Sequence, residues 1–250
     1  MEDIMKNALF LFLVLLPGTV LGQIDLIDDF ATTQTENGFR YLAFGDNRPV
    51  NITNPSTSVT DLTLALDGSI PNGSETFTGD VWVGNGDILP YVQNEDRGFL
   101  ALHPESLSSG ALAAAILFDV QTDGNYSIEG DFARANDFRN AGNGVDVGIY
   151  LNEDFSSPLF ESSISSDHEV SIDNVFGGTG VSTFDFSADV EAGDRISFFV
   201  FADSQGLDAG FDVTALRGTV TAIPEPSYSL FLGLTGLATL VRRGRAKVAT

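Results

Sequence analysis

Three aspartates, Asp203, Asp208 and Asp212, lie close together in a stretch that also contains Gly206 and Gly210. Carboxylate oxygens on a flexible loop are the hard ligands that Ca²⁺ prefers. The spacing does not follow that of an EF-hand loop, so two interpretations stay open: a structural calcium ion, or an acidic turn in solvent. Calcium is the one candidate cofactor that the sequence suggests.

Two aromatic residues are candidate contacts for a sugar ligand, because exposed rings with a polar edge suit such surfaces. Tyr91 follows Pro90 in a polar segment, and its ring is predicted to be exposed. Trp82 lies between Val81 and Val83 and is the second candidate. The alternative for both rings is packing in the protein interior.

The sequence assigns no catalytic residue. His103 precedes Pro104 at the end of a predicted strand, without a nucleophile elbow or a zinc-binding histidine pair. The alternative to a catalytic role is that His103 forms a hydrogen bond with the backbone of a loop. Glycosidases need two carboxylates at a defined separation, which the sequence does not reveal. We therefore expect a protein that is not an enzyme.

The composition excludes several classes of protein. The 250 residues include 35 acidic and 12 basic side chains, for a net charge of −23, and no cysteine. Without cysteine, a disulfide framework and a thiolate zinc site are excluded. The negative charge argues against a nucleic-acid partner, since phosphate binding requires Lys and Arg. The ends of the chain hold several of the basic residues, namely Lys6, Arg242, Arg243, Arg245 and Lys247.

Short apolar runs, often alternating and separated by turn residues, indicate strands. The predicted strands cover residues 39–44, 61–66, 76–83, 97–102, 112–120, 125–133, 144–151, 169–174, 181–190, 195–201 and 211–221. Residues 111–117 have the alanine content of a helix, but the strands on both sides favour a buried strand. The pattern predicts an all-β domain over residues 23–222, an antiparallel β-sandwich of the jelly-roll type. Its predicted core residues are Phe44, Leu64, Leu102, Phe118, Ile128, Phe132, Val147, Ile149, Phe186, Phe198, Val200 and Val213.

The N-terminal segment has the layout of a secretory signal peptide. An apolar run, Ala8–Leu16, is followed by Pro17 and by small or medium residues up to Gly22. We predict a signal peptide over residues 1–22 that signal peptidase removes after Gly22. Translation from Met5 would give the signal peptide the basic start that such segments usually have. The alternative to a signal peptide is that this apolar run forms a buried helix of the fold.

The C-terminal segment, residues 223–250, has three parts in order. A Pro224-Glu225-Pro226 motif precedes an apolar stretch, Tyr228–Val241, which is short for the roughly 17–25 residues of a membrane span. Arg242, Arg243 and Arg245 follow, and basic residues favour the cytoplasmic side. The segment predicts a single hydrophobic helix that anchors the chain transiently in the inner membrane.

These three parts together resemble the PEP-CTERM sorting signal of Gram-negative bacteria. The resemblance covers residues 224–247 and implies recognition by an exosortase, a membrane-embedded cysteine transpeptidase. It also implies processing near Pro224–Pro226 and a destination at the cell surface or in the exopolysaccharide matrix. An ordinary tail anchor is the alternative.

The body resembles an uncharacterised jelly-roll module common in PEP-CTERM proteins and similar to carbohydrate-binding sandwiches. The resemblance follows the order of Phe39–Asp46, Trp82, Gly98–Pro104, Gly124–Phe132, Gly144–Ile149, Val190–Val200 and Asp208–Leu216. Relatives often have His-Pro-Gly where this chain has Glu105 after Pro104. We expect an exported, non-catalytic surface or matrix protein that binds exopolysaccharide; the alternative is an extracellular carbohydrate-active enzyme with paired carboxylates.

Overall fold

The computed structural model describes residues 23–31, 33–45, 59–61, 63–65, 81–83, 91–95, 98–107, 110–135, 144–165, 175–178, 180–202 and 213–224. The strands are β1 (Ile24–Asp25), β2 (Phe39–Gly45), β3 (Val59–Asp61), β4 (Thr63–Ala65), β5 (Val81–Val83), β6 (Tyr91–Glu95), β7 (Phe99–His103), β8 (Glu105–Leu107), β9 (Gly110–Asp119), β10 (Gly124–Arg134), β11 (Gly144–Leu151), β12 (Phe160–Ser165), β13 (Val181–Val190), β14 (Arg195–Ala202) and β15 (Thr214–Ile223). The described residues also contain two short 3-10 segments, η1 (Glu36–Gly38) and η3 (Val175–Gly177). No helix among the described residues is long and apolar enough to cross a bilayer.

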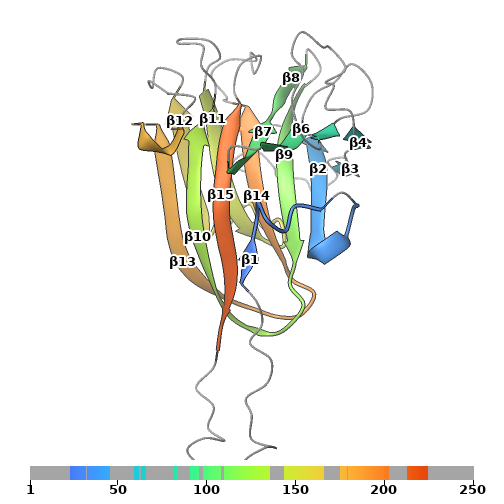
Figure 1. Cartoon of the computed structure of the whole chain (residues 1–250), viewed down its shortest axis with the longest axis vertical. Coiled ribbons are helices and arrows are strands. Elements are labelled where there is room, and N and C mark those ends of the chain that lie inside the picture. The colour runs from blue at the N-terminus through green and yellow to red at the C-terminus, as the bar shows by residue number, and fades with distance from the viewer. Residues whose placement is uncertain are drawn as a thin grey trace, which may run out of the picture.

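The strands form two antiparallel sheets that lie face to face (Figure 1). Sheet A has the order β13-β10-β15-β7-β6-β5-β4, with β1 paired to β15, and sheet B has the order β12-β11-β14-β9-β2-β3, with β8 paired to β9. The prediction of an all-β, antiparallel fold is therefore confirmed. Both ends of the described chain leave the sandwich at its lower end in Figure 1.

From β9 to β15 the chain crosses between the sheets at every connection except that between β11 and β12. As a result, the order β7-β15-β10-β13 in sheet A faces the order β9-β14-β11-β12 in sheet B. Two sheets wound in this way have the arrangement of a jelly roll. Strands distant in sequence, such as β10 and β15, thus become neighbours and bring their side chains onto one surface.

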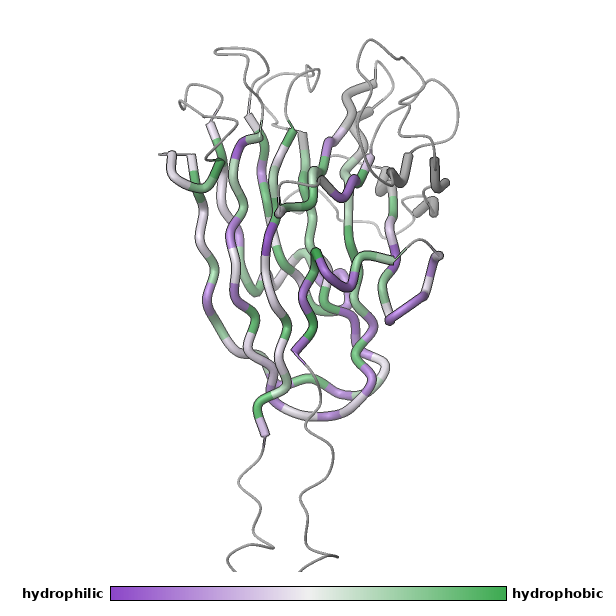
Figure 2. Tube along the Cα trace, viewed as in Figure 1, coloured by the Kyte–Doolittle hydropathy of each residue, from purple (hydrophilic) through white to green (hydrophobic). Residues whose placement is uncertain are grey.

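The inner faces of the two sheets share one apolar core, because alternate residues of a strand point to the same side. Figure 2 shows apolar and polar residues alternating along many of the strands. Most of the predicted core is buried there, namely Leu102, Phe118, Ile128, Phe132, Val147, Ile149, Phe198 and Val200. Phe186 is partly buried against this core, and Val213 against a smaller cluster. The side chains of Phe44 and Leu64 lie outside the described residues.

A pair of glycines makes room for an aromatic ring in this core. Gly130 of β10 lies directly opposite Gly218 of β15. A Cβ at position 130 would lie 2.5 Å from Cζ of Phe184, and one at position 218 would lie 3.2 Å from the same atom. The glycine that interrupts the apolar alternation of β10 therefore serves packing.

The structure corrects some of the predicted strands. Residues 111–117 do lie in a strand, as predicted: β9 is an inner strand of sheet B, and both of its faces are covered. The single strand predicted over residues 61–66 is instead divided between β3 and β4, which belong to different sheets. Strand β12 was not predicted, because serines interrupt its apolar residues Phe160 and Ile164.

Candidate functional site

The face of sheet A that points away from the core has a covered part and an open part. In the covered part Ala101, Ala215 and Ala133 lie side by side in one register row. Their small side chains leave space for η3, and Val175 of η3 is buried in the same cluster. The neighbouring rows carry polar residues of β10, β13 and β15, namely Ser127, Glu129, Asp131, Thr183, Asp185, Arg217 and Thr219.

Arg217 lies at the border between the two parts and is held by two partners, Asp131 and the ring of Phe176. Its Nε donates to Oδ2 of Asp131 at 2.8 Å, and its Nη2 lies 2.7 Å from the same oxygen. The other oxygen of Asp131 accepts a hydrogen bond from Oγ1 of Thr183 at 2.6 Å. The guanidinium carbon lies 4.0 Å from the centre of the Phe176 ring. With 47% of its side chain exposed, Arg217 presents an oriented donor to solvent.

Two carboxylates face each other beside this group. Glu129 of β10 is directly paired with Asp185 of β13, and both residues are exposed. Oγ of Ser127 donates to Oε1 of Glu129 at 2.8 Å. Like charges in directly opposite positions cost stability. The pair nevertheless places two hydrogen-bond acceptors next to each other on the exposed sheet face.

The open face, defined as Glu129, Asp131, Thr183, Asp185 and Arg217 with the Phe176 ring, can hydrogen-bond a polyhydroxylated ligand. Carboxylates accept hydrogen bonds from hydroxyl groups, and the guanidinium donates to their oxygens. The ring of Phe176 adds an apolar border. We take this open face as the candidate site.

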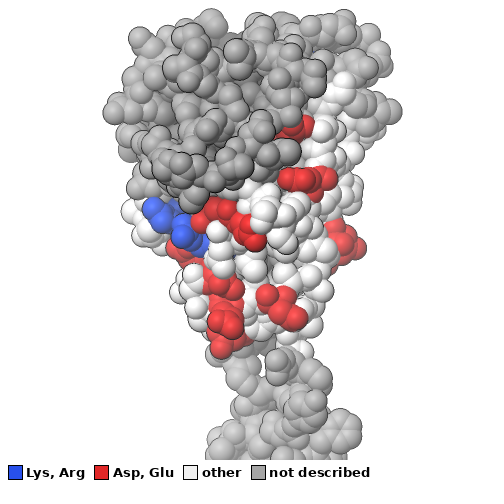
Figure 3. Space-filling model, turned by 180° about the vertical axis from the view of Figure 1, so that it is seen from behind, with Lys and Arg blue, Asp and Glu red and all other residues white. Residues whose placement is uncertain are grey.

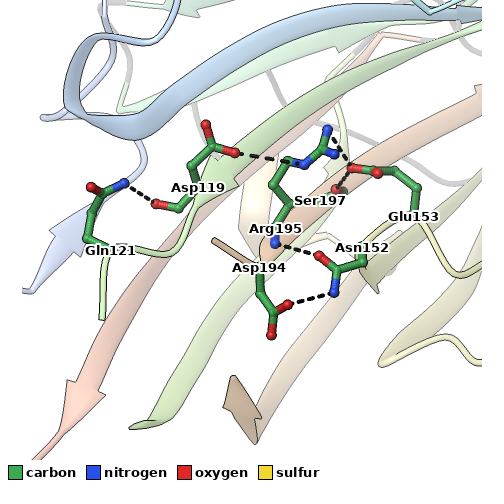
Figure 4. Close-up of polar contacts among 7 residues, drawn as sticks. All are labelled: Asp119, Gln121, Asn152, Glu153, Asp194, Arg195 and Ser197. Carbon is green, nitrogen blue, oxygen red and sulfur yellow. Dashed lines mark hydrogen bonds and ion pairs between the residues drawn. The ribbon is translucent and has the colours of Figure 1, made fainter. Parts of the chain in front are cut away.

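Figure 4 shows a second polar cluster, which lies where Arg195 of β14 is paired with Asp119 of β9. Arg195 lies between two acids: its Nη1 is 3.4 Å from Oε1 of Glu153, and its Nε is 3.9 Å from Oδ1 of Asp119. Asn152 accepts from the backbone N–H of Arg195 at 2.9 Å and donates to Oδ1 of Asp194 at 2.8 Å. The cluster thus joins β9, β14 and the β11–β12 turn.

This cluster supports an unusual turn. Asn152 and Glu153 have φ values of 54° and 53°, in the left-handed region that is costly for Glu. The pKa of Asp194 is lowered, first by the backbone N–H of Glu191 and then by the amide of Asn152. Because these groups bind one another, we assign the cluster a structural role.

The outer face of sheet B is apolar and buried. It carries Leu42, Ala113, Ala115, Leu117, Tyr150, Phe199 and Phe201, with Phe155 packed against them. Oη of Tyr150 donates to Oε1 of Glu161 at 2.9 Å, and burial, followed by this bond, raises the pKa of Tyr150. The unbroken apolar run 198–201 is the sequence signal for burial on both faces of β14.

Figure 3, which views the molecule from behind, shows acidic side chains scattered over the described surface and a small basic patch.

The prediction of an exposed Tyr91 is wrong. Tyr91 is only 2% exposed, and its ring stacks on that of His103, 5.1 Å between centres. The two residues are directly paired across β6 and β7, and Gln93, on the same side of β6 as Tyr91, is buried as well. Burial lowers the pKa of His103 to about 4, which keeps its ring neutral at pH 7. Trp82 belongs to β5, but its side chain lies outside the described residues.

Most other predicted site residues also lie outside the described residues. These are the calcium candidates Asp203, Asp208 and Asp212 and the sorting residues Glu225, Pro226, Arg242, Arg243 and Arg245. Pro224 is described: it follows β15 directly and is exposed. In the part of the chain that the structure describes, no group of three or more His, Asp or Glu side chains is arranged to hold a metal ion.

Comparison with known proteins gives only distant similarities. No protein-family model matches the chain, and no curated protein matches it. Among solved structures, CBM51 from Clostridium perfringens GH95, in complex with methyl-galactose, is 11% identical with a TM-score of 0.36, covering 80% of this chain and 100% of that one. The K3 cleaved adhesin domain of Lys-gingipain from Porphyromonas gingivalis is 12% identical with a TM-score of 0.38, covering 81% and 98%. Similarities this distant do not identify a ligand or an activity for this chain.

Proposed function

We propose that this chain is an exported protein, sorted by an exosortase to the cell surface or extracellular matrix, whose sandwich binds polysaccharide without cleaving it. Both addressing segments are proposed from their sequence patterns alone. Support for a self-contained body between them comes from where the described strands begin and end.

The two ends of the body pair with each other. Ile24 of β1 lies opposite Val220 of β15. Strand β1 begins two residues after Gly22, the proposed signal-peptidase site. Strand β15 ends at Ile223, immediately before the exposed Pro224. Removal of both proposed addressing segments would therefore leave every described strand in place. These strand ends are compatible with both proposed cleavages, and this compatibility is the support for removal of the two segments.

The open face supports the binding part of the proposal. It combines an oriented guanidinium, carboxylates, hydroxyls and an aromatic ring on a rigid sheet, and such groups suit the hydroxyl-rich surface of a polysaccharide. A rival function also has an observation in its favour. The opposed carboxylates Glu129 and Asp185 would be the pair that a carbohydrate-active enzyme needs.

One experiment separates the two functions. The exported protein is incubated with a panel of neutral and acidic bacterial polysaccharides, and both retention and released reducing ends are measured. Retention without reducing ends is the expected result. Reducing ends that disappear in a Glu129→Gln variant would establish the enzyme instead, and the absence of both signals would reject polysaccharide binding.

A matched pair of variants tests the position of the site. Arg217→Gln on the open face should weaken retention by about tenfold, since a desolvated charged hydrogen bond contributes roughly 1–3 kcal/mol. Arg195→Gln makes the same change in the second polar cluster, where Arg195 is also ion-paired to acids and partly exposed, and should leave retention unchanged. Equal effects of the two variants would exclude the open face.

A further inference from the structure

Strand β13 is the outermost strand of sheet A in the described part of the chain. It pairs with β10 continuously, from Gly124 with Val190 to Ala133 with Val181, without a bulge. Its other edge is paired with no strand that the structure describes. A long, regular edge presents unpaired N–H and C=O groups that another strand can bind.

Several of the usual protections against such pairing are missing from this strand. Native edge strands are blunted by charged side chains, especially lysine, by proline, by bulges or by short length, and of these β13 has only the exposed acids Asp185 and Asp189. The sequence of β13, VSTFDFSADV, contains no proline and no basic residue over its 10 residues. Residues on its inner side are apolar around Phe184 and Phe186, and those on its outer side are short and polar.

We infer that β13 pairs antiparallel with β13 of a second copy of this chain, about a twofold axis that passes beside Phe186. In an antiparallel pair, residues directly opposite each other lie on the same face of the sheet. A register that places two acids opposite each other is therefore disfavoured by charge repulsion. An axis at Asp185 would place this carboxylate against its own copy. An axis at Ser187 would oppose Asp185 to Asp189.

The register centred on Phe186 avoids both clashes of charge. It places Asp185 opposite Ser187 of the second copy and Thr183 opposite Asp189. The hydroxyl of Thr183 already donates to Asp131 across β10 and β13 at 2.6 Å, so of the two pairs only Ser187 with Asp185 would form a new hydrogen bond of this kind. On the inner side, Phe186, which is only partly buried in one copy, meets Phe186 of the other. Avoidance of directly opposed carboxylates and apolar contact therefore favour the same register.

The pairing joins the two copies of sheet A into one sheet and places both open faces on the same side. Under the proposed function, these faces could engage one polysaccharide together. The antiparallel arrangement also directs the chain ends of the two copies in opposite directions. Two bodies anchored in one membrane would therefore not pair in this way, and assembly would follow release.

Cysteine crosslinking tests the register directly, because the chain contains no cysteine. Residues opposed in an antiparallel pair lie about 4.5–5.5 Å apart at Cα, which suits a disulfide. The full chain, solubilised in detergent so that processing is not required, should form a disulfide-linked dimer as Phe186→Cys. Ser127→Cys, at the position on β10 paired with Ser187, is the matched control and should stay monomeric. Crosslinking of both variants, or of neither, would overturn the register.

A second pair of variants does not disturb Phe186. Ser187→Asp should raise the dissociation constant of the dimer about tenfold, since two new pairs of like charge form across the axis, whereas Ser187→Lys should lower it. The same substitutions at Ser127 should have no effect. Sedimentation of the detergent-solubilised chain measures all four. A wild-type chain that stays monomeric, or Ser187 variants that match it, would refute the pairing while leaving the sorting and polysaccharide experiments unaffected.

Discussion

The ring of Tyr150 lies over the backbone of Gly148, two residues earlier on the same face of β11. A Cβ at position 148 would lie 2.6 Å from Cε2 and Cζ of this ring. The ring has little freedom to move, because Tyr150 is 1% exposed, bonded to Glu161 and packed against Phe155 and Phe199. Position 148 therefore requires glycine for packing.

We expect Gly148→Ala to lower the free energy of unfolding by about 1–3 kcal/mol, the usual cost of overpacking. In a Tyr150→Ala background the same substitution should cost much less, because the closest atoms to a Cβ at 148 all belong to Tyr150. Urea unfolding of the four proteins gives the coupling energy. An equal cost in both backgrounds would show that the ring is not the obstacle.

His103 should make the fold sensitive to acid. Burial lowers its pKa in the folded state to about 4, whereas the unfolded value is near 6.5. Between these values the unfolded chain binds more protons, so stability falls as the pH falls from about 6.5 to 4. The shift corresponds to at most roughly 3 kcal/mol.

This contribution can be isolated with His103→Gln. The loss of stability between pH 7 and about pH 4.5 should be smaller in the variant than in the wild type, as measured by urea midpoints. A variant with the same pH dependence would assign the acid sensitivity to the many carboxylates instead.

The long strands could be predicted from sequence because their side chains alternate over many residues. The bounds predicted for residues 144–151 and 181–190 agree with those of β11 and β13. Tyr91 could not be placed correctly, because β6 has the polar sequence YVQNE although its first three side chains are buried, and Pro90 before it suggested a loop. The burial of Tyr91 depends on its pairing with His103, which the local sequence pattern does not predict.

The candidate site could not be predicted for a related reason. Asp131 and Arg217 are 86 residues apart in sequence and meet only because β10 and β15 are neighbours in sheet A. Thr183, which bonds the same carboxylate, comes from a third strand. With so many acids in the chain, spacing alone gave no reason to prefer Asp131.

Asn152 should be important through both its amide and its backbone. Asn152→Ala loses the bonds to Asp194 and Arg195 and places alanine at a φ of 54°. Asn152→Gly loses the same bonds but relieves the backbone. We expect thermal unfolding to show that the alanine variant is less stable than the glycine variant by about 1 kcal/mol. Equal stabilities would mean that the left-handed turn is not retained.

The amino terminus of the exported protein should be Gln23. Cleavage after Gly22 leaves β1 complete, including the backbone bond from Leu26 N–H to the carbonyl of Gly218 at 3.0 Å. N-terminal sequencing of the surface form measures this directly. A terminus beyond Asp25 would remove β1, and one before Ala8 would mean that no signal peptide is cleaved.

The carboxyl terminus of the surface form should lie between Pro224 and Pro226. The last residues of β15 are paired with β10, through Ile223 with Asn125 and Ala222 with Tyr126, so an earlier cut would open the sheet. Pro224 lacks a backbone N–H and is exposed, which ends the ladder and leaves the peptide accessible.

Two deletions test whether this motif directs the cut. A chain lacking Pro224–Pro226 should remain uncut and bound to the membrane, because the recognition element is missing. A chain lacking Tyr228–Thr250 should be secreted in soluble form without sorting. Mass spectrometry of the C-terminal peptide decides the matter for the wild type: if the surface form retains Arg242–Lys247, the segment is a plain tail anchor and no exosortase acts on it.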